Sequence, residues 1–202
     1  MNGPSALMMM MKASIPFLLN GNMDHPESRI LTMQPVLNRE LLPGNTCFGC
    51  GLENPHGLHI EVHRVPDSPD SLFARFTPTD HMAGFPGITH GGAIYTALDC
   101  LSTWVATLLG PNRGAAWLLR SAHTTYRNPT APGSPLTLIG RIKKQGGEWE
   151  PVLVQTEARR ADGVVCVETE FKVVPLTPAK FAELAGIDQL PANWRAFLSG
   201  AS

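Results

Sequence analysis

The chain has 202 residues, 43% of them hydrophobic, which is enough to bury the core of one domain with additional terminal segments. Its formal net charge of −1 gives no overall attraction to nucleic acids or to anionic membranes, so neither is an expected partner. Four cysteines do not form a dense disulfide framework, and the apolar stretches near the start are too short for a secretory signal or a membrane span, so we expect a reduced, cytoplasmic protein.

Residues 1–45 mix Met, Pro, Asn and Gly with one possible helix at 28–42, which indicates an N-terminal extension. Alternation of apolar and polar residues then predicts a strand at 59–65, and residues 71–77 are expected to be its hairpin partner. We expect the residues between them, 66–70, to form the turn because they contain two prolines and two aspartates.

The segment before the first strand carries the sequence Cys47-Phe-Gly-Cys50-Gly and then Asn54-Pro. Such a cysteine pair is half of a zinc knuckle, and a complete site needs further ligands. Cys100 and Cys166 are expected in a helix and in a strand, not in a second pair of this kind. We therefore interpret the first two cysteines as thiols packed in a turn, and we predict no metal site and no cofactor. Asn54, taken alone, is turn chemistry.

An irregular loop carrying His81, which we expect at the surface, leads to the most apolar stretch of the chain. Residues 93–109 contain no Pro, Gly, Lys or Arg, and their apolar side chains cover more of the circumference than a surface helix needs. The sequence therefore predicts a long helix surrounded by other elements. Its single carboxylate, Asp99, would be costly to bury without a partner or a function.

The start of this helix is rich in glycine. We expect Thr89 to cap it, which would leave the N–H groups of Gly91, Gly92 and Ala93 at the positive end of the helix. Such an end can hold a carbonyl oxygen as it becomes negative.

The rest of the chain alternates strands with tight turns and ends in two short helices. The predicted strands are 116–126, 136–144, 152–160 and 164–174, with hairpin turns at 145–148 and 161–163, and the predicted helices are 177–185 and 193–198. An antiparallel sheet with one apolar face and a helix that is apolar nearly all round pack best with the sheet curved about the helix. We therefore predict an α+β protein in which about six strands wrap around one central helix.

Two motifs resemble those of hotdog-fold acyl-CoA thioesterases of the PaaI-like branch, which includes enzymes of the 4-hydroxybenzoyl-CoA thioesterase type. The first is His90-Gly91-Gly92 followed, after six residues, by Asp99. The second is the Cys-x-x-Cys-Gly and Asn-Pro-x-Gly-Leu segment at the entry to the first strand. The resemblance covers residues 46–175 and leaves 176–202 as a C-terminal helical extension.

The resemblance implies hydrolysis of an acyl-CoA thioester. Asp99 would be the base or nucleophile, the Gly91 amide would polarise the thioester oxygen, His90 would orient the thioester and Gly92 would keep the wall of the site open. The resemblance also implies three candidate substrate-binding residues. Asn54 would lie near the thioester, and Ser121 would supply the nearest hydroxyl, because Leu119 stands where relatives often have one. Arg127 could meet CoA phosphates, together with Arg141, Lys143 and Lys144.

Helix geometry adds a requirement of its own. Eight residues at about 1.5 Å each separate Gly91 from Asp99 by about 12 Å, yet both must come within about 3 Å of one reacting centre. One chain cannot achieve this, so we predict a site shared between subunits of a two-fold dimer. The resemblance likewise implies a homodimer, or a homotetramer built from two dimers.

Two other functions stay open at this point. Leu119 in place of a hydroxyl is compatible with a non-enzymatic acyl-CoA-binding or scaffold protein on the same fold. A hotdog dehydratase is a weaker alternative, because that branch uses an Asp/His pair in a different sequence context.

Overall fold

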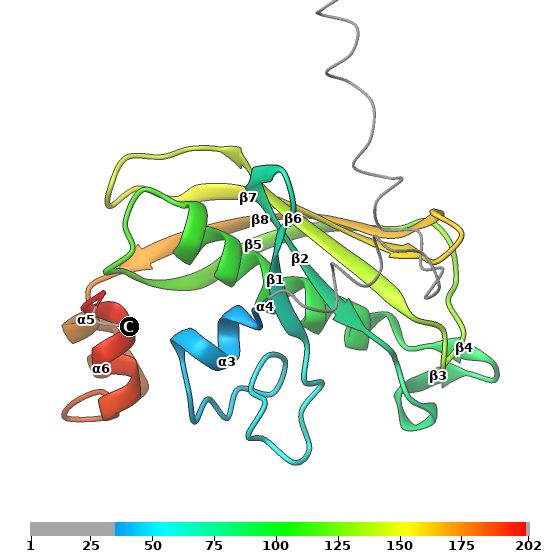
Figure 1. The fold of residues 1–202 in the computed structure, drawn as a ribbon, viewed down its shortest axis with the longest axis horizontal. Helices are drawn as coiled ribbons and strands as arrows, with labels where there is room; N and C mark the ends of the chain where they lie inside the picture. The colour runs from blue at the N-terminus through cyan, green and yellow to red at the C-terminus, as the bar shows by residue number, and fades with distance from the viewer. Residues whose placement is uncertain (1–34, 201–202) are drawn as a thin grey trace, which may run out of the picture.

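Helix α4 (Gly91–Leu109) lies against one face of a six-stranded antiparallel sheet that curves around it (Figure 1). This computed structural model describes residues 35–200. The strand order is β1-β2-β6-β7-β8-β5, and α4 packs against β2, β5, β6, β7 and β8. The strands are β1 (Glu61–Val65), β2 (Ser68–Phe76), β5 (Ala116–Tyr126), β6 (Leu136–Lys144), β7 (Val152–Arg160) and β8 (Val165–Leu176). The predicted α+β arrangement is therefore confirmed.

The apolar residues of the strands and of the helix share one core. On β8, Val167, Phe171 and Val173 are buried, whereas the charged residues Glu168, Glu170 and Lys172 alternate with the buried ones and are more exposed. Gly140 on β6 allows the helix to approach the sheet closely, because a Cβ at this position would lie 2.8 Å from Cγ2 of Val105. By length and composition alone α4 could span a membrane, but most of it is buried inside the protein, as a core helix should be.

Two local predictions before the helix are wrong. The turn between β1 and β2 is shorter than 66–70, because β2 begins at Ser68 and Asp67 adopts a left-handed conformation with φ of 58°. The loop before the helix is also more ordered than predicted. It contains a 3-10 turn, η3 (Asp80–Met82), and a two-stranded ribbon of β3 (Ala83–Phe85) and β4 (Ile88–Thr89).

Part of the predicted N-terminal extension packs onto the domain. The helix expected at 28–42 lies partly outside the described residues; within them the structure has a shorter helix, α3 (Leu37–Leu41), whose N-cap residue is Val36. The buried side chain of Asn38 donates hydrogen bonds to the carbonyl oxygens of Cys50 and Ile60, at 2.7 and 3.0 Å, and accepts one from the Val62 N–H at 3.0 Å. These bonds tie α3 to the cysteine-containing loop and to β1.

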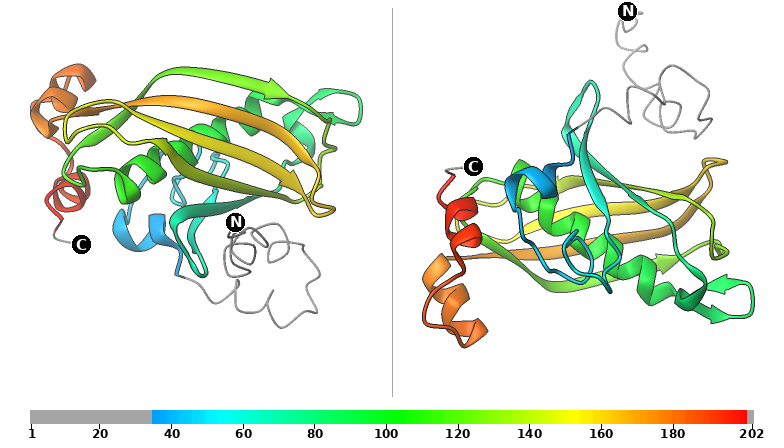
Figure 2. Two further views of the ribbon diagram at one scale, coloured as in Figure 1. Left: turned by 90° about the horizontal axis from the view of Figure 1, so that it is seen from above. Right: turned by 60° about the horizontal axis from the view of Figure 1, so that its bottom comes forward.

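The two predicted C-terminal helices are present as α5 (Pro178–Ala185) and α6 (Ala192–Leu198), and they pack at one end of the sheet (Figure 2). The rings of Phe181 and Trp194 lie 5.7 Å apart, and that of Phe197 lies 5.4 Å from Trp104 of α4. The C-terminal segment thus reaches the central helix.

Candidate active site

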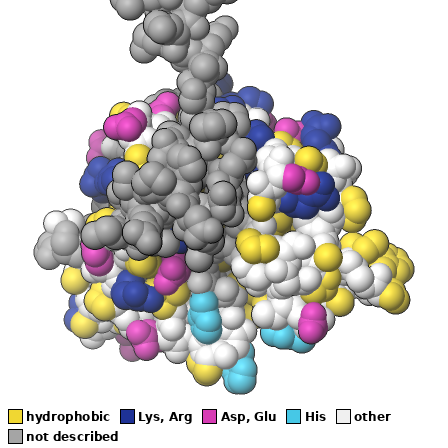
Figure 3. Space-filling model, turned by 45° about the vertical axis from the view of Figure 1, so that its right-hand side comes forward, with side chains coloured by type: hydrophobic (Ala, Val, Ile, Leu, Met, Phe, Trp, Pro, Cys, Tyr) yellow, Lys and Arg dark blue, Asp and Glu magenta, His cyan; other side chains and the backbone are white. Residues whose placement is uncertain are grey.

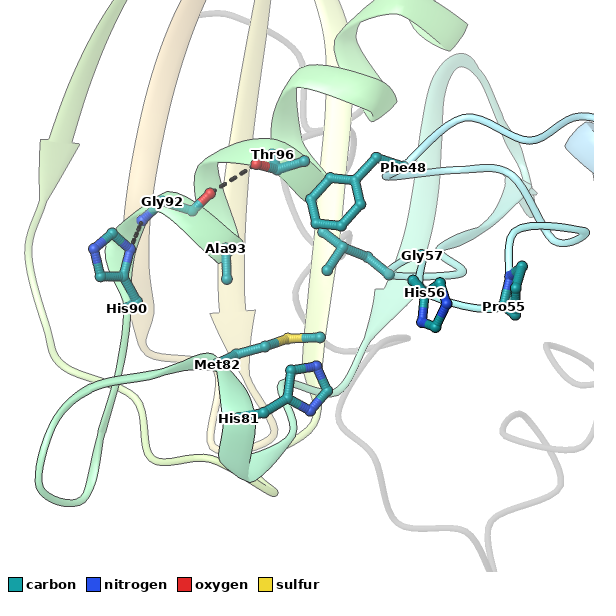
Figure 4. Close-up of a pocket in the computed structure, with 11 residues that line it drawn as sticks. Phe48, Pro55, His56, Gly57, His81, Met82, His90, Gly92, Ala93 and Thr96 are labelled. Carbon is teal, nitrogen blue, oxygen red and sulfur yellow. Dashed lines mark hydrogen bonds between the residues drawn. The ribbon is translucent and has the colours of Figure 1, made fainter.

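The start of α4 is capped by His90, so the prediction that Thr89 caps it is wrong. Helix α4 begins at Gly91, which makes His90 the N-cap residue, and its ring Nδ1 accepts a hydrogen bond from the Gly92 N–H at 2.9 Å (Figure 4). Thr89 is buried in the preceding strand, and its hydroxyl has no partner among the described residues. Because Nδ1 accepts, the proton of a neutral His90 ring is on Nε2.

This cap decides which amide at the helix start is free. The Gly92 N–H is bonded to the His90 ring, and the Ala93 N–H donates to the carbonyl oxygen of His90 at 3.0 Å. Within residues 35–200 we find no acceptor for the Gly91 N–H. Of the three amides expected to point out of the helix, Gly91 therefore remains as the available donor.

A cavity of about 610 Å³ opens beside the helix start (Figure 4). The cavity is lined by the N-cap residue His90 and by Gly92 and Thr96 of α4. The 46–58 loop contributes Phe48 and His56, and η3 contributes His81. His81 is exposed, as expected, and it also lines this cavity.

Asn54 shapes the loop beside this cavity and is not among its lining residues. Its side chain donates to the carbonyl oxygen of Thr46 at 3.1 Å and accepts from the N–H of His56 at 2.9 Å. The described contacts of Asn54 are thus those of a turn residue, and its role toward a thioester stays a prediction.

Gly91 faces a second cavity, of about 320 Å³, between the β3–β4 ribbon and the end of β5. The Tyr126 hydroxyl donates a hydrogen bond to the Gly91 carbonyl oxygen at 3.4 Å, and a Cβ at position 91 would lie 2.7 Å from Cε1 of that ring. Tyr126, Phe85 and Ile88 are exposed here, and hydrophobic side chains gather on this side of the surface (Figure 3). Sequence analysis did not identify Tyr126, whose position depends on the long-range pairing of β5 with β8.

Asp99 lies two turns further along α4, on the wall of a third cavity of about 410 Å³. The other lining residues are mostly apolar and come from α4, β5 and the C-terminal helices; they include Trp104, Trp117, Leu119, Phe181, Trp194 and Phe197. Burial, and to a lesser extent the nearby Cys47 thiolate, raises the pKa of the Asp99 carboxyl from 3.8 to about 6. A carboxylate with such a pKa suits general base catalysis near neutral pH.

The remaining substrate-binding candidates lie on or just after β5. Leu119 lines the Asp99 cavity, whereas Ser121 is exposed beyond an irregularity in the β5–β8 pairing. Arg127 forms an ion pair with Glu168 at 2.5 Å, and Lys143 forms one with Glu170. The role of Arg127 in CoA binding stays a prediction.

Gly91 and Asp99 of one chain do not share a cavity, since each lines a different one.

The structure also brings Cys100 of α4 against Cys47 and Cys50, with all three Sγ atoms within 4.8 Å of one another. The prediction that Cys100 is separate from that pair is wrong, because a contact between a loop and a distant helix leaves no pattern in the sequence.

Comparison with known proteins matches residues 86–167 to the family described as the thioesterase superfamily. No curated protein gives a significant match.

Similar solved structures include the PaaI protein of the E. coli phenylacetic acid degradation operon. It has 16% identity and a TM-score of 0.52, and the match covers 59% of this chain and 80% of that chain. A putative thioesterase from Ralstonia eutropha, described as a phenylacetic acid degradation-related protein, has 18% identity, coverage of 69% and 99%, and a TM-score of 0.56. A Streptococcus mutans protein bound to acetyl-CoA has 17% identity, coverage of 58% and 89%, and a TM-score of 0.51. At these identities the structural likeness shows the fold, and it confirms the predicted hotdog fold.

Proposed function

We propose that the protein hydrolyses an acyl-CoA thioester to the free acid and CoA, because residues 86–167 match the thioesterase superfamily. The observation that carries this proposal is the position of Asp99, a carboxylate with a raised pKa on the wall of an apolar cavity. The apolar wall supports an acyl chain as the occupant of this cavity, and in the proposal Asp99 acts at the thioester end of that chain. Support for CoA as the carrier comes from the Streptococcus mutans protein, whose structure contains acetyl-CoA.

In the proposed reaction the Gly91 N–H donates a hydrogen bond to the thioester oxygen and stabilises its negative charge as the carbonyl carbon is attacked. Asp99 either removes a proton from the attacking water and passes it to the departing CoA sulfur, or attacks the carbon itself to form an anhydride that water then hydrolyses to the free acid and Asp99. In the second route the departing CoA sulfur takes its proton from water, so CoA leaves as the thiol in both routes. His90 holds the first turn of the helix in place and presents its ring to the cavity at the helix start.

Gly91 of one subunit and Asp99 of another form each site in this proposal. The separation of the two residues within one chain supports it, since they line different cavities. Strand β5 provides a surface for pairing, because it ends the sheet and its outer edge has no partner strand within residues 35–200. The exposed apolar residues around Gly91 provide a further surface that a second subunit can cover. We propose a homodimer, alone or paired into a tetramer, in the cytoplasm.

The test is thiol release from a panel of acyl-CoAs of different chain length, including aromatic ones, by the purified full-length protein. Asp99→Asn should lower the rate by at least about 100-fold, whereas Asp188→Asn, at an exposed carboxylate between α5 and α6, should leave it unchanged. Full activity of the Asp99→Asn protein would overturn the assignment of Asp99.

A non-enzymatic acyl-CoA-binding protein remains the second candidate, favoured by Leu119 on the wall of the Asp99 cavity. Saturable binding of acyl-CoA without release of free thiol, across the whole panel, would support this alternative over hydrolysis.

A further inference from the structure

Three cysteines from two distant segments meet beside Asp99. Cys47 and Cys50 lie in the loop that leads to β1, and Cys100 lies on α4. Their Sγ atoms are all within 4.8 Å of one another, and those of Cys47 and Cys100 are 3.7 Å apart. Nothing in the proposed hydrolysis requires a thiol at this place.

The spacing of the sulfur atoms matches the requirements of a metal ion. In a tetrahedral zinc site with Zn–S bonds of about 2.3 Å, two sulfur ligands lie about 3.8 Å apart. The Cys47–Cys100 pair already has this separation, and the other two pairs need to close by at most about 1 Å to reach it. A disulfide would instead require the sulfur atoms to approach to about 2.05 Å.

The side chain of Asn45 holds the two cysteines of the loop in place. The Asn45 side chain accepts a hydrogen bond from the Cys47 N–H at 3.0 Å and donates one to Cys50 Sγ at 3.5 Å. Partners of this kind orient the ligands of metal sites.

Gly49 fixes the distance between the loop and the helix. A Cβ at this position would lie 2.3 Å from Cys100 Sγ, so the loop backbone lies directly on α4 at this cysteine. Any side chain here would push the two segments apart and separate Cys100 from the cysteine pair.

We propose that Cys47, Cys50 and Cys100 together bind one zinc ion, which fastens the 45–51 loop to α4 next to Asp99. All three cysteines line the same cavity as Asp99. Within residues 35–200 no fourth His, Cys, Asp or Glu joins the group, so a water molecule from the cavity completes the tetrahedron. The proposal reverses the interpretation of the cysteine pair as packed thiols, and it does not depend on thioester hydrolysis.

The experiment measures zinc per chain by elemental analysis of the full-length protein, expressed with added zinc and purified without chelator and without a histidine tag. We expect about one zinc per chain in the natural protein. Cys47→Ser, Cys50→Ser and Cys100→Ser should each reduce it at least tenfold. Cys166→Ser is the matched control, since this buried cysteine on β8 is not part of the group, and it should keep the full amount.

A second measurement covers the case in which a ligand variant does not fold. The natural protein, stripped by chelator under reducing conditions, is titrated with Co²⁺, and a thiolate charge-transfer absorption band should saturate at one equivalent. Stripped, folded protein that takes up neither Zn²⁺ nor Co²⁺ would overturn the proposal. Full zinc content in Cys100→Ser would do so as well, because the site would then lie elsewhere.

Discussion

The Nδ1 atom of His90 accepts a hydrogen bond from the Gly92 N–H at 2.9 Å, and this bond leaves the neighbouring Gly91 N–H as the free donor at the start of α4. One side chain thus both stabilises the helix and determines which amide can meet a substrate. The two roles of His90 can be separated by mutation.

We expect His90→Ala to destabilise the protein by about 1 kcal/mol through loss of the cap, and His90→Asn to restore most of that stability because asparagine is a good N-cap residue. Thermal unfolding measures both changes. If His90 also orients the thioester, His90→Asn should remain slow in the thiol-release assay despite its stability. Equal activity of His90→Asn and the natural protein would limit His90 to capping.

The role of the Gly91 amide can be tested by removing its hydrogen. Gly91→Pro deletes the N–H at the first helical position, where proline is tolerated, and His90 already has the extended conformation (φ −62°, ψ 126°) that a following proline requires. Because any Cβ here meets Tyr126, Gly91→Ala is the matched control that adds the Cβ and keeps the N–H. We expect kcat/KM of Gly91→Pro to be about 100-fold below that of Gly91→Ala. Similar values for the two variants would show that the amide is not the oxyanion donor.

Asp99 should give the reaction a characteristic pH dependence. A base must be ionised to act, so kcat/KM should rise with pH, reach half of its maximum near the Asp99 pKa of about 6, and level off above about pH 7. Initial rates in buffers of constant ionic strength measure the profile. A midpoint near pH 4, the ordinary range for Asp, would show that burial does not raise the pKa of the catalytic carboxyl.

The same pKa predicts a cost in stability. Below pH 3.8, the pKa of Asp99 in the unfolded chain, the carboxyl is protonated in both the folded and the unfolded protein. As the pH rises from there through about 6, the pKa in the folded protein, burial of the ionised carboxylate lowers the stability of the fold. Asp99→Asn should therefore be more stable than the natural protein at neutral pH, by on the order of 1–2 kcal/mol after allowance for partial access of water. The two should unfold at similar temperatures at pH 4. A destabilised Asp99→Asn at neutral pH would indicate that the ionised carboxylate is paired.

A shared site predicts complementation between two inactive variants. When Asp99→Asn subunits are mixed with Gly91→Pro subunits and allowed to exchange, half of the dimers are mixed, and each mixed dimer contains one intact site. Activity should therefore return to about a quarter of the natural level at equal mixing. Subunit exchange, followed by mass, is the control. Mixed dimers that form without any return of activity would contradict a site built from both chains.

The sequence predicted well the strands that are bounded by clear turn residues. Strands 116–126, 136–144 and 152–160 have the predicted limits, and on 152–160 buried side chains also alternate with partly exposed ones. The helix cap was assigned one residue too early, since histidine is a less common cap than threonine and its ring was not considered as an acceptor. The contact of Cys100 with the cysteine pair and the covering of the Asp99 cavity by Trp194 and Phe197 depend on long-range packing, for which a single sequence has no periodic signal.

The C-terminal helices close the Asp99 cavity with Phe181, Trp194 and Phe197, and all three residues lie beyond the 86–167 region that matches the superfamily. In the proposed enzyme, the far wall that an acyl chain encounters therefore comes from a segment separate from the residues that carry out the reaction. Exchange of this terminal segment can retune the preferred acyl length while the reacting groups stay untouched, so chain-length preference and reaction chemistry can evolve independently.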